Sequence, residues 1–296
     1  MPCRTVIQKH GHNDDEYVHT SQQLPVEIIQ EIVAFCAIEK EAACRLCLVC
    51  RTFFEWTVQH LYHTVSLTGL RCKVFYSALA SPFRGRFYRS AVKNLWIQTP
   101  QLSQTTHNLT HVERLAISTF RDKAAIQSAC ISPSFTHLTA FDGPSDAIGT
   151  YFPRRIPMKL AGVTHLVVSI QELPFLANIT PEAFPDLTHV VVCIAVDCGD
   201  QDRSVIAAFF ENLRRWRKLR VVGLRPFFWD GRSGRFMGAR VDIETIMDFL
   251  GFGGGVVIDG KMVVLQDVEV GQREWEGWGR GEETVWEMAE SLVSIL

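Results

Sequence analysis

The sequence lacks the features that would direct a chain to or through a membrane. Its first 23 residues, MPCRTVIQKHGHNDDEYVHTSQQ, contain no apolar core of the roughly 7–15 residues that a signal peptide needs. No stretch approaches the roughly 20 consecutive apolar residues of a membrane-spanning helix. We therefore expect residues 1–21 to form a flexible tail and the protein to lie in the cytosol or the nucleus.

An excess of charge of either sign is also missing. The formal net charge is −2 and the isoelectric point is near 6.6, so extensive binding of nucleic acid or of an anionic membrane is not expected. The basic run RRWRKLR, residues 214–220, offers a local nucleic-acid contact as a second interpretation. Its first interpretation is the polar end of an amphipathic helix with an apolar inner face formed by Ile206, Phe209, Phe210 and Leu213.

A complete disulfide framework is not expected among the nine cysteines, because their number is odd and the missing secretion signal indicates a reducing compartment. Three cysteines stand three residues apart in CRLCLVCRTF, residues 44–53, but no second C-x2-C pair follows that would complete a zinc site. On a single helix, an apolar stripe would contain Leu46, Val49, Cys50 and Phe53. We therefore interpret the cysteines as small buried apolar residues and predict no metal and no cofactor.

Short helices dominate the region that follows the tail. LPVEIIQEIVAF begins with a proline, which a first helical turn tolerates, and continues with apolar residues at helical spacing. A second helical stretch runs through EAACRLCLVCRTFFEWTVQHLY, and TVSL after it is typical of a short strand. Two or three short helices bury little apolar surface by themselves, so this unit needs a partner or a following domain.

Three sub-motifs in this region resemble an F-box over roughly residues 22–67. They are Leu24-Pro25-x-Glu27-Ile28, then Leu48-Val49-Cys50-Arg51-x-Phe53, then Leu61-Tyr62-x-x-Val65-x-Leu67. The resemblance implies docking on the Skp-type adaptor of a cullin-RING ubiquitin ligase, while the rest of the chain recruits a target protein. It places five residues at the adaptor interface, namely Leu24, Pro25, Ile28, Leu46 and Val49.

An imperfect repeat follows. The pattern φ-x-x-φ-x-φ, where φ is apolar, begins at residues 92, 112, 135, 163, 187 and 219. Short strands with helical segments such as RDKAAIQSACI and DRSVIAAFFENLRRW between them fit an irregular leucine-rich-repeat-like solenoid. An ordinary α/β domain with a mostly parallel sheet gives the same alternation of strands and helices and is the alternative.

Alternation along each strand predicts which side chains leave the core. The φ positions face inward, and the residues between them line the concave face of the solenoid. We predict that this face is exposed and binds the target through Trp96, Arg114, His137, His165 and His189. Three histidines at one register could also suggest a metal site, but exposed polar residues of a repeat are the simpler interpretation.

The chain is expected to end in a hairpin and a helix. VVIDGKMVVL, after a helix DIETIMDFL, is typical of a hairpin with a turn at Asp259-Gly260. A helix from about Glu282, preceded by Trp275 and Trp278 and carrying Trp286, should pack at the end of the repeats as a cap. This ending resembles those of fungal F-box proteins with divergent repeats.

The predicted fold class is α/β, with a helical F-box, a solenoid of short parallel strands and helices, and a closing hairpin and helix. The domains are a tail (1–21), the F-box (22–67), the repeat-like domain (68–270) and a capping helix (271–296). We expect a non-catalytic subunit of an SCF-type ubiquitin ligase that recruits a target protein and binds neither nucleic acid nor membrane. The alternatives are an F-box scaffold without a cullin, and an enzyme, for which no motif places a nucleophile and a base.

Overall fold

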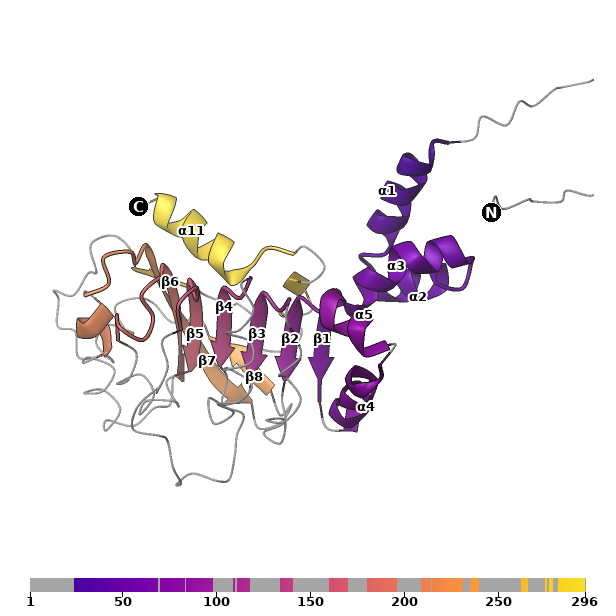
Figure 1. The fold of residues 1–296 in the computed structure, drawn as a ribbon. Coiled ribbons are helices and arrows are strands. Elements are labelled where there is room, and N and C mark those ends of the chain that lie inside the picture. The colour runs from indigo at the N-terminus through magenta and orange to yellow at the C-terminus, as the bar shows by residue number, and fades with distance from the viewer. Residues whose placement is uncertain are drawn as a thin grey trace, which may run out of the picture.

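A computed structural model of the 296-residue chain shows a helical arm attached to one end of a parallel sheet (Figure 1). The structure describes residues 24–68, 70–82, 84–97, 109, 111–117, 134–140, 160–169, 180–195, 209–213, 215–230, 235–239, 262–265, 275, 277–278 and 282–295.

The arm consists of three helices, α1 (Val26–Cys36), α2 (Lys40–Leu46) and α3 (Arg51–His63). Pro25 is the N-cap of α1, where its missing N–H costs no helical hydrogen bond. Small inward-facing residues let the helices approach one another, since Ala43 and Thr57 are fully buried. The arm ends where α3 leads directly into the first strand.

The sheet contains the strands β1 to β8 in chain order, with β9 also paired to β7. The pairs from β1 to β7 and the pair of β9 with β7 are parallel, whereas β8 is antiparallel to β7. Helices α4 (Leu70–Ala80) and α5 (Arg84–Ala91) connect β1 to β2. The strands are β1 (Thr64–Leu67), β2 (Asn94–Ile97), β3 (Arg114–Ile117), β4 (His137–Ala140), β5 (His165–Ser169), β6 (His189–Ala195), β7 (Val221–Asp230), β8 (Arg235–Gly238) and β9 (Met262–Val264).

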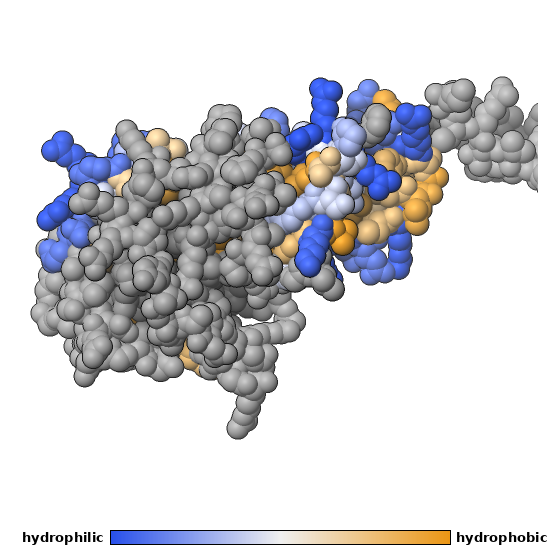
Figure 2. Space-filling model, turned by 60° about the horizontal axis from the view of Figure 1, so that its bottom comes forward, coloured by the Kyte–Doolittle hydropathy of each residue, from blue (hydrophilic) through white to orange (hydrophobic). Residues whose placement is uncertain are grey.

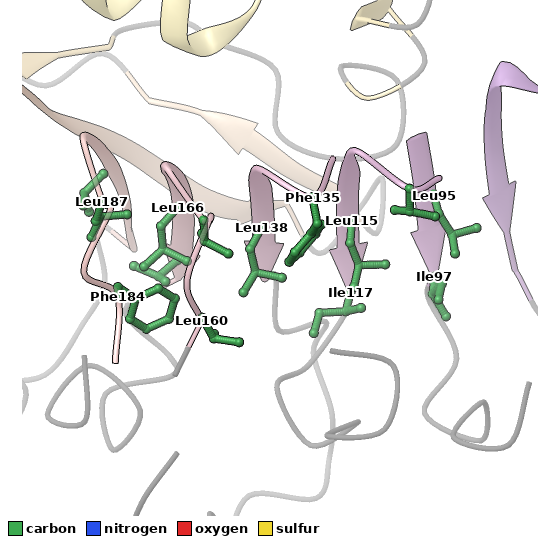
Figure 3. Close-up of a cluster of buried hydrophobic side chains, with 14 of the residues drawn as sticks. Leu95, Ile97, Leu115, Ile117, Phe135, Leu138, Leu160, Leu166, Phe184 and Leu187 are labelled. Carbon is green, nitrogen blue, oxygen red and sulfur yellow. The ribbon is translucent and has the colours of Figure 1, made fainter. Parts of the chain in front are cut away.

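Corresponding positions of the sequence repeat stand side by side in the sheet. Leu95 pairs with Leu115, and Leu115 with Leu138, and the same column continues through Leu166 and Val190. These leucines and their neighbours project from one face of the strands into a shared core (Figure 3). The repeat pattern therefore predicted the strands and their inward-facing residues correctly, and the sheet is compatible with a repeat-like solenoid.

The backbone repeats with the strands. The carbonyl oxygen of Thr136 accepts hydrogen bonds from the amides of Thr164 and His165, and the carbonyl of Thr164 accepts from Thr188 and His189 in the same way. In the same way, the carbonyl of Lys93 accepts from the amides of Glu113 and Arg114, and the carbonyl of Glu113 accepts from the amides of Thr136 and His137. The first residue of each strand from β3 to β7 is thus hydrogen-bonded to the residue before the preceding strand.

A second buried layer covers the opposite face of the sheet. Trp275, Trp278 and the final helix α11 (Val285–Ile295) pack against Ala116, Val167, Val191 and Val263. Helix α11 begins with a capping box, because the Thr284 hydroxyl accepts from the amide of Glu287 while the Glu287 carboxylate accepts from the amide of Thr284. The C-terminal helix contacts β7 and β9 at the end of the sheet, as the expected cap would, and its Trp286 also reaches over the histidines of β4, β5 and β6.

The middle of the arm also differs from the prediction. Residues 41–62 form two helices rather than one, because α2 ends at Leu46 and α3 begins at Arg51. The apolar stripe proposed for Leu46, Val49, Cys50 and Phe53 does not exist as one helix face. Cys50 adopts an extended conformation, and its sulfur accepts a hydrogen bond from the amide of Phe53, so it caps the next helix.

Several predictions lie wholly or partly outside the described residues. These are the tail (1–21), the helices expected in 121–131 and 242–250, and the first strand and turn of the hairpin in 256–265. Within that hairpin, Met262–Val264 is a strand and pairs with β7. In the segment 202–216, residues 209–213 are helical, and Phe209, Phe210 and Leu213 are buried as expected. None of the helices in the described ranges is long and apolar enough to span a bilayer.

Replacing Leu166 by Ala should lower the free energy of unfolding by about 2–5 kcal/mol, since this fully buried side chain would leave a cavity in the shared core. Chemical denaturation of the full chain measures the change. The matched control is Val74→Ala on α4, where the side chain is 72% exposed and the expected change is within about 0.5 kcal/mol. Equal effects of the two substitutions would contradict the assignment of the core.

Candidate functional site

The largest accumulation of exposed apolar side chains lies on the helical arm. In the described part of the chain, twelve large apolar side chains are exposed, and nine of them fall between residues 24 and 54. Figure 2 shows hydrophobic residues gathered at the end of the molecule that the arm forms. We call these nine residues the arm surface: Leu24, Val26, Ile28, Ile32, Phe35, Ile38, Leu48, Val49 and Phe54.

Helix α1 is apolar on two opposite sides, and only one of them is used within the chain. Val33 and Ala37 are buried against the other arm helices. Ile28, Ile32 and Phe35 follow one another at helical spacing on the opposite side, and Phe35 remains 76% exposed. A stripe of this kind on a surface helix is typical of a binding face, because scattered single apolar residues would show no such spacing.

The turn between α2 and α3 adds a second part to the arm surface. Leu48 and Val49 are 87% and 63% exposed, and they stand between the end of α2 and the cap formed by Cys50. The chain turns here because the amides of Leu48 and Val49 donate to the carbonyls of Arg45 and Leu46 in a tightened last turn. The two apolar side chains are thereby held outward.

The five residues predicted at the adaptor interface all lie on or beside this surface. Leu24, Pro25, Ile28 and Val49 are exposed, whereas Leu46 is half-buried. The prediction did not include Ile32, Phe35 or Leu48. The helical spacing from Ile28 could have identified Ile32 and Phe35, but the break after α2, on which the exposure of Leu48 depends, was not recognised.

An aromatic cluster attaches the arm to the sheet domain. Tyr62 at the end of α3 packs on Tyr88 and Phe87 of α5, with ring centroids 4.7 Å and 5.9 Å apart, and Tyr88 packs on Phe75 of α4. A side-chain hydrogen bond with Tyr88 raises the pKa of Tyr62 to about 12, and burial acts in the same direction. The arm therefore joins the domain through its own packed contact and leaves its far side uncovered.

The cysteines of the arm are free thiols, and they are not the buried apolar residues that we expected. Cys44 is exposed, and Cys47 and Cys50 are partly exposed. Burial raises the pKa of Cys47, and the neighbouring Cys44 adds to this. In the described ranges, no group of three or more His, Cys, Asp or Glu side chains is arranged to hold a metal ion.

The residues predicted to bind the target are brought together on one face, as the register requires, but that face is not exposed. Trp96 is 7% exposed and lies 6.1 Å from the ring of Trp275, and His189 is 4% exposed. Arg114 is half-buried close to Glu287 of α11, and His137 and His165 lie beneath Trp286. The expectation of an open face was wrong because the C-terminal segment packs on it.

The sequence contained a signal for this cover. HLVVS and HVVVCIA are continuous apolar runs, which are typical of parallel strands buried on both faces. Val167 and Val191, which alternate with the core residues, are fully buried under the C-terminal segment. The prediction used the φ positions alone, and it therefore assigned one face of the strands to the core and the other face to solvent.

The three histidines stack on one another instead of converging on a point. The ring centroids of His137 and His165 are 4.1 Å apart and those of His165 and His189 are 4.3 Å apart, with nearly parallel planes. Each Nδ1 lies within hydrogen-bonding distance of the preceding threonine hydroxyl, at 2.7 Å, 2.8 Å and 2.7 Å in chain order. Parallel stacked rings direct their nitrogens side by side, which does not suit a shared metal ion.

Comparisons of the chain with protein-family models, with curated proteins and with solved structures gave no match.

Replacing Cys50 by Ser should leave the free energy of unfolding unchanged or raise it by up to about 1 kcal/mol, because serine is a preferred N-cap. Cys50→Ala should lower it by about 0.5–1 kcal/mol, since the amide of Phe53 loses its acceptor. Thermal and chemical denaturation measure both. Cys44→Ser, on the exposed side of α2, is the matched control and should change nothing. Clear destabilisation by Cys50→Ser would argue against a capping role.

Replacing Trp96 by Ala should lower the free energy of unfolding by about 3–5 kcal/mol, because the indole is buried against Trp275. Chemical denaturation followed by far-UV circular dichroism measures the loss. Phe228→Ala, which removes an exposed aromatic ring from β7, is the control and should cost about 1 kcal/mol or less. A Trp96→Ala protein as stable as the parent would show that the C-terminal segment does not cover this residue.

Proposed function

We propose that this protein is a substrate-recruiting subunit of an SCF-type cullin-RING ubiquitin ligase. Its arm would bind a Skp-type adaptor as an F-box, and its sheet domain, a divergent leucine-rich-repeat-like solenoid, would hold a target protein. The observation that carries the proposal is the arm surface, nine exposed apolar side chains on a small unit of three helices.

The placement of the three F-box sub-motifs supports this function. The first lies at the start of α1, the second spans the turn into α3, and the third runs from the end of α3 into β1. Leu24, Ile28 and Val49 from the first two sub-motifs are exposed, while Leu67 from the third is buried in the sheet core. The sub-motifs thus divide into outward-facing residues that a partner could cover and residues that attach the arm.

The amount of exposed apolar surface also favours a stable partner. Covering a single leucine or phenylalanine is worth about 1.5–3 kcal/mol, so a few of the nine side chains would suffice for a specific complex. The arm extends away from the sheet (Figure 1), so that a protein bound there need not displace the domain.

The proposed mechanism is proximity and needs no catalytic residue. The adaptor and cullin would hold the ligase at the arm while the sheet domain holds the target, which raises the effective concentration of target lysines near the ligase. We assign target binding to the sheet domain as a whole and not to particular residues. Trp96, Arg114 and the three histidines lie under or beside the C-terminal segment. An F-box scaffold that binds the adaptor without a cullin is the second candidate, and co-purification of adaptor without cullin would favour it.

The paired change Leu24→Ala and Pro25→Ala should weaken binding of a purified Skp-type adaptor at least about tenfold. Truncating an interface anchor often costs roughly 2 kcal/mol, and about 1.4 kcal/mol corresponds to one decade of affinity. Isothermal titration calorimetry with the full chain measures the affinity. Phe35→Ala, on the same side of α1 as Ile28, should act in the same direction.

Val74→Ala is the matched control, since it removes an exposed apolar side chain outside the arm and should leave adaptor affinity unchanged. An unaltered melting temperature of each variant would show that the fold is retained. A parent chain without adaptor affinity, or a double variant that binds as well as the parent, would refute the proposal. Proximity labelling in cells with cullin activity blocked, comparing parent and double variant, would then separate targets from ligase components.

A further inference from the structure

The histidine stack forms a continuous polar column within the second buried layer. His137, His165 and His189 are consecutive partners in the strand register, and the next position toward the arm is Arg114. The apolar neighbours Val167 and Val191 on the same face are fully buried. Three adjacent imidazoles in such a layer are unusual, because each buried imidazole needs hydrogen-bond partners, whereas an apolar side chain at the same position would need none.

Helix α11 closes directly over this stack. The ring of Trp286 meets His165 nearly edge-on at 5.0 Å and lies 6.4 Å and 6.1 Å from His137 and His189. Val285 and Ala289, on the same side of α11, are buried as well. One indole therefore lies against all three imidazoles, of which His189 is buried and His137 and His165 are half-buried.

Among the residues that the structure describes, one of the three rings has a charged partner that would accommodate a second proton. The Nε2 atom of His189 lies 2.8 Å from Oε1 of Glu290 on α11. Its Nδ1 lies 2.7 Å from the Thr188 hydroxyl, which also lies 3.0 Å from the carbonyl oxygen of Thr164. The hydroxyl can donate to the neutral ring, or turn to the carbonyl and accept from the charged one.

The charged groups around the other two rings oppose protonation. The positive charge of Arg114 on β3 disfavours a proton on His137 and on His165, and a charge on His189 would disfavour it further. From α11, Glu287 faces Arg114, and Glu290 faces His189, which Arg220 also approaches. Over the ranges that the structure describes, no carboxylate contacts His137 or His165, so a proton on either ring would stand within about 4 Å of another imidazole.

We propose that helix α11 is an acid-released cover of the sheet face, held closed while the stacked histidines are neutral and detached when His137 and His165 become protonated. The released state would expose His137, His165 and His189 beside Arg114, a cationic column in place of an apolar layer. Trp275 packs on Trp96 of β2 and on Trp278, and these ring contacts do not involve α11, so the proposal expects them to remain when the helix detaches. The proposal does not depend on the ubiquitin-ligase function.

The pKa directions agree with the geometry. Burial lowers the pKa of His137 to about 3 and that of His165 to about 2, and the neighbouring cations act in the same direction. Burial also lowers the pKa of His189, although Glu290 opposes this. Because the uncovered rings would titrate near about 6.5, the open state binds more protons below that pH, and the closed state loses stability as the pH falls from about 6.5 toward 3.

Hydrogen exchange of the backbone amides of α11, measured in the full chain, tests the proposal. After correction for the intrinsic effect of pH, the opening constant of residues 285–295 should rise between about pH 7.5 and 5.5. The rise should be about tenfold if one ring takes up a proton on opening and about 100-fold if two do. Amides of β5 should keep their protection, because the release is local.

The variant His137→Gln with His165→Gln should reduce the rise to the part that His189 alone contributes, since glutamine keeps a polar side chain of similar length without a titrating group. His60→Gln, an exposed histidine on α3, is the matched control and should retain the full rise. The proposal is overturned if exchange of α11 does not change with pH in this window, or if the double variant keeps the full rise of the parent. It is equally overturned if α11 and β5 lose protection together, because the protein would then unfold as a whole.

Discussion

Each strand from β1 to β7 pairs with its successor without a shift in register, and this alignment determines what every face of the domain contains. Leu95, Leu115, Leu138 and Leu166 meet in one column because their strands begin at the same level. The same alignment stacks the three histidines on the opposite face. A shift of one residue would exchange the two faces, so the repeated amide contacts at the start of each strand are essential to the fold.

The sheet domain buries its apolar faces within the chain, whereas the arm leaves part of its apolar surface exposed. The sheet domain uses its own chain for both covers, with one apolar core on the face of the leucines and a second under Trp275, Trp278 and α11. The arm covers only one side of α1 and leaves Ile28, Ile32 and Phe35 outward. This difference favours a protein–protein contact at the arm over one at the covered sheet face, which is where the proposed function places the adaptor.

Two errors of the sequence interpretation share a physical origin. The stretch around Cys47 and Val49 has helical periodicity, but a helix end depends on caps, and a cysteine sulfur at Cys50 is not a usual cap. The sheet face with Trp96 was predicted to be open because the alternating pattern shows which side chains point away from the first core. The pattern does not show which other segment of the chain packs on those side chains. In both cases the structure depends on a contact that the periodicity of apolar residues does not predict.

The sequence by itself determined the local elements and the order of the sheet. Proline at residue 25, the φ-x-x-φ-x-φ repeats and the TVSL segment were sufficient for the start of α1, for strands β2 to β7 and for β1, because these features depend on spacing and backbone preference within a few residues. Only the tertiary structure decided which apolar surfaces remain free. Glu290 meets His189 across about a hundred residues of chain, and Trp286 covers histidines from three strands, and no local pattern specifies such distant pairs.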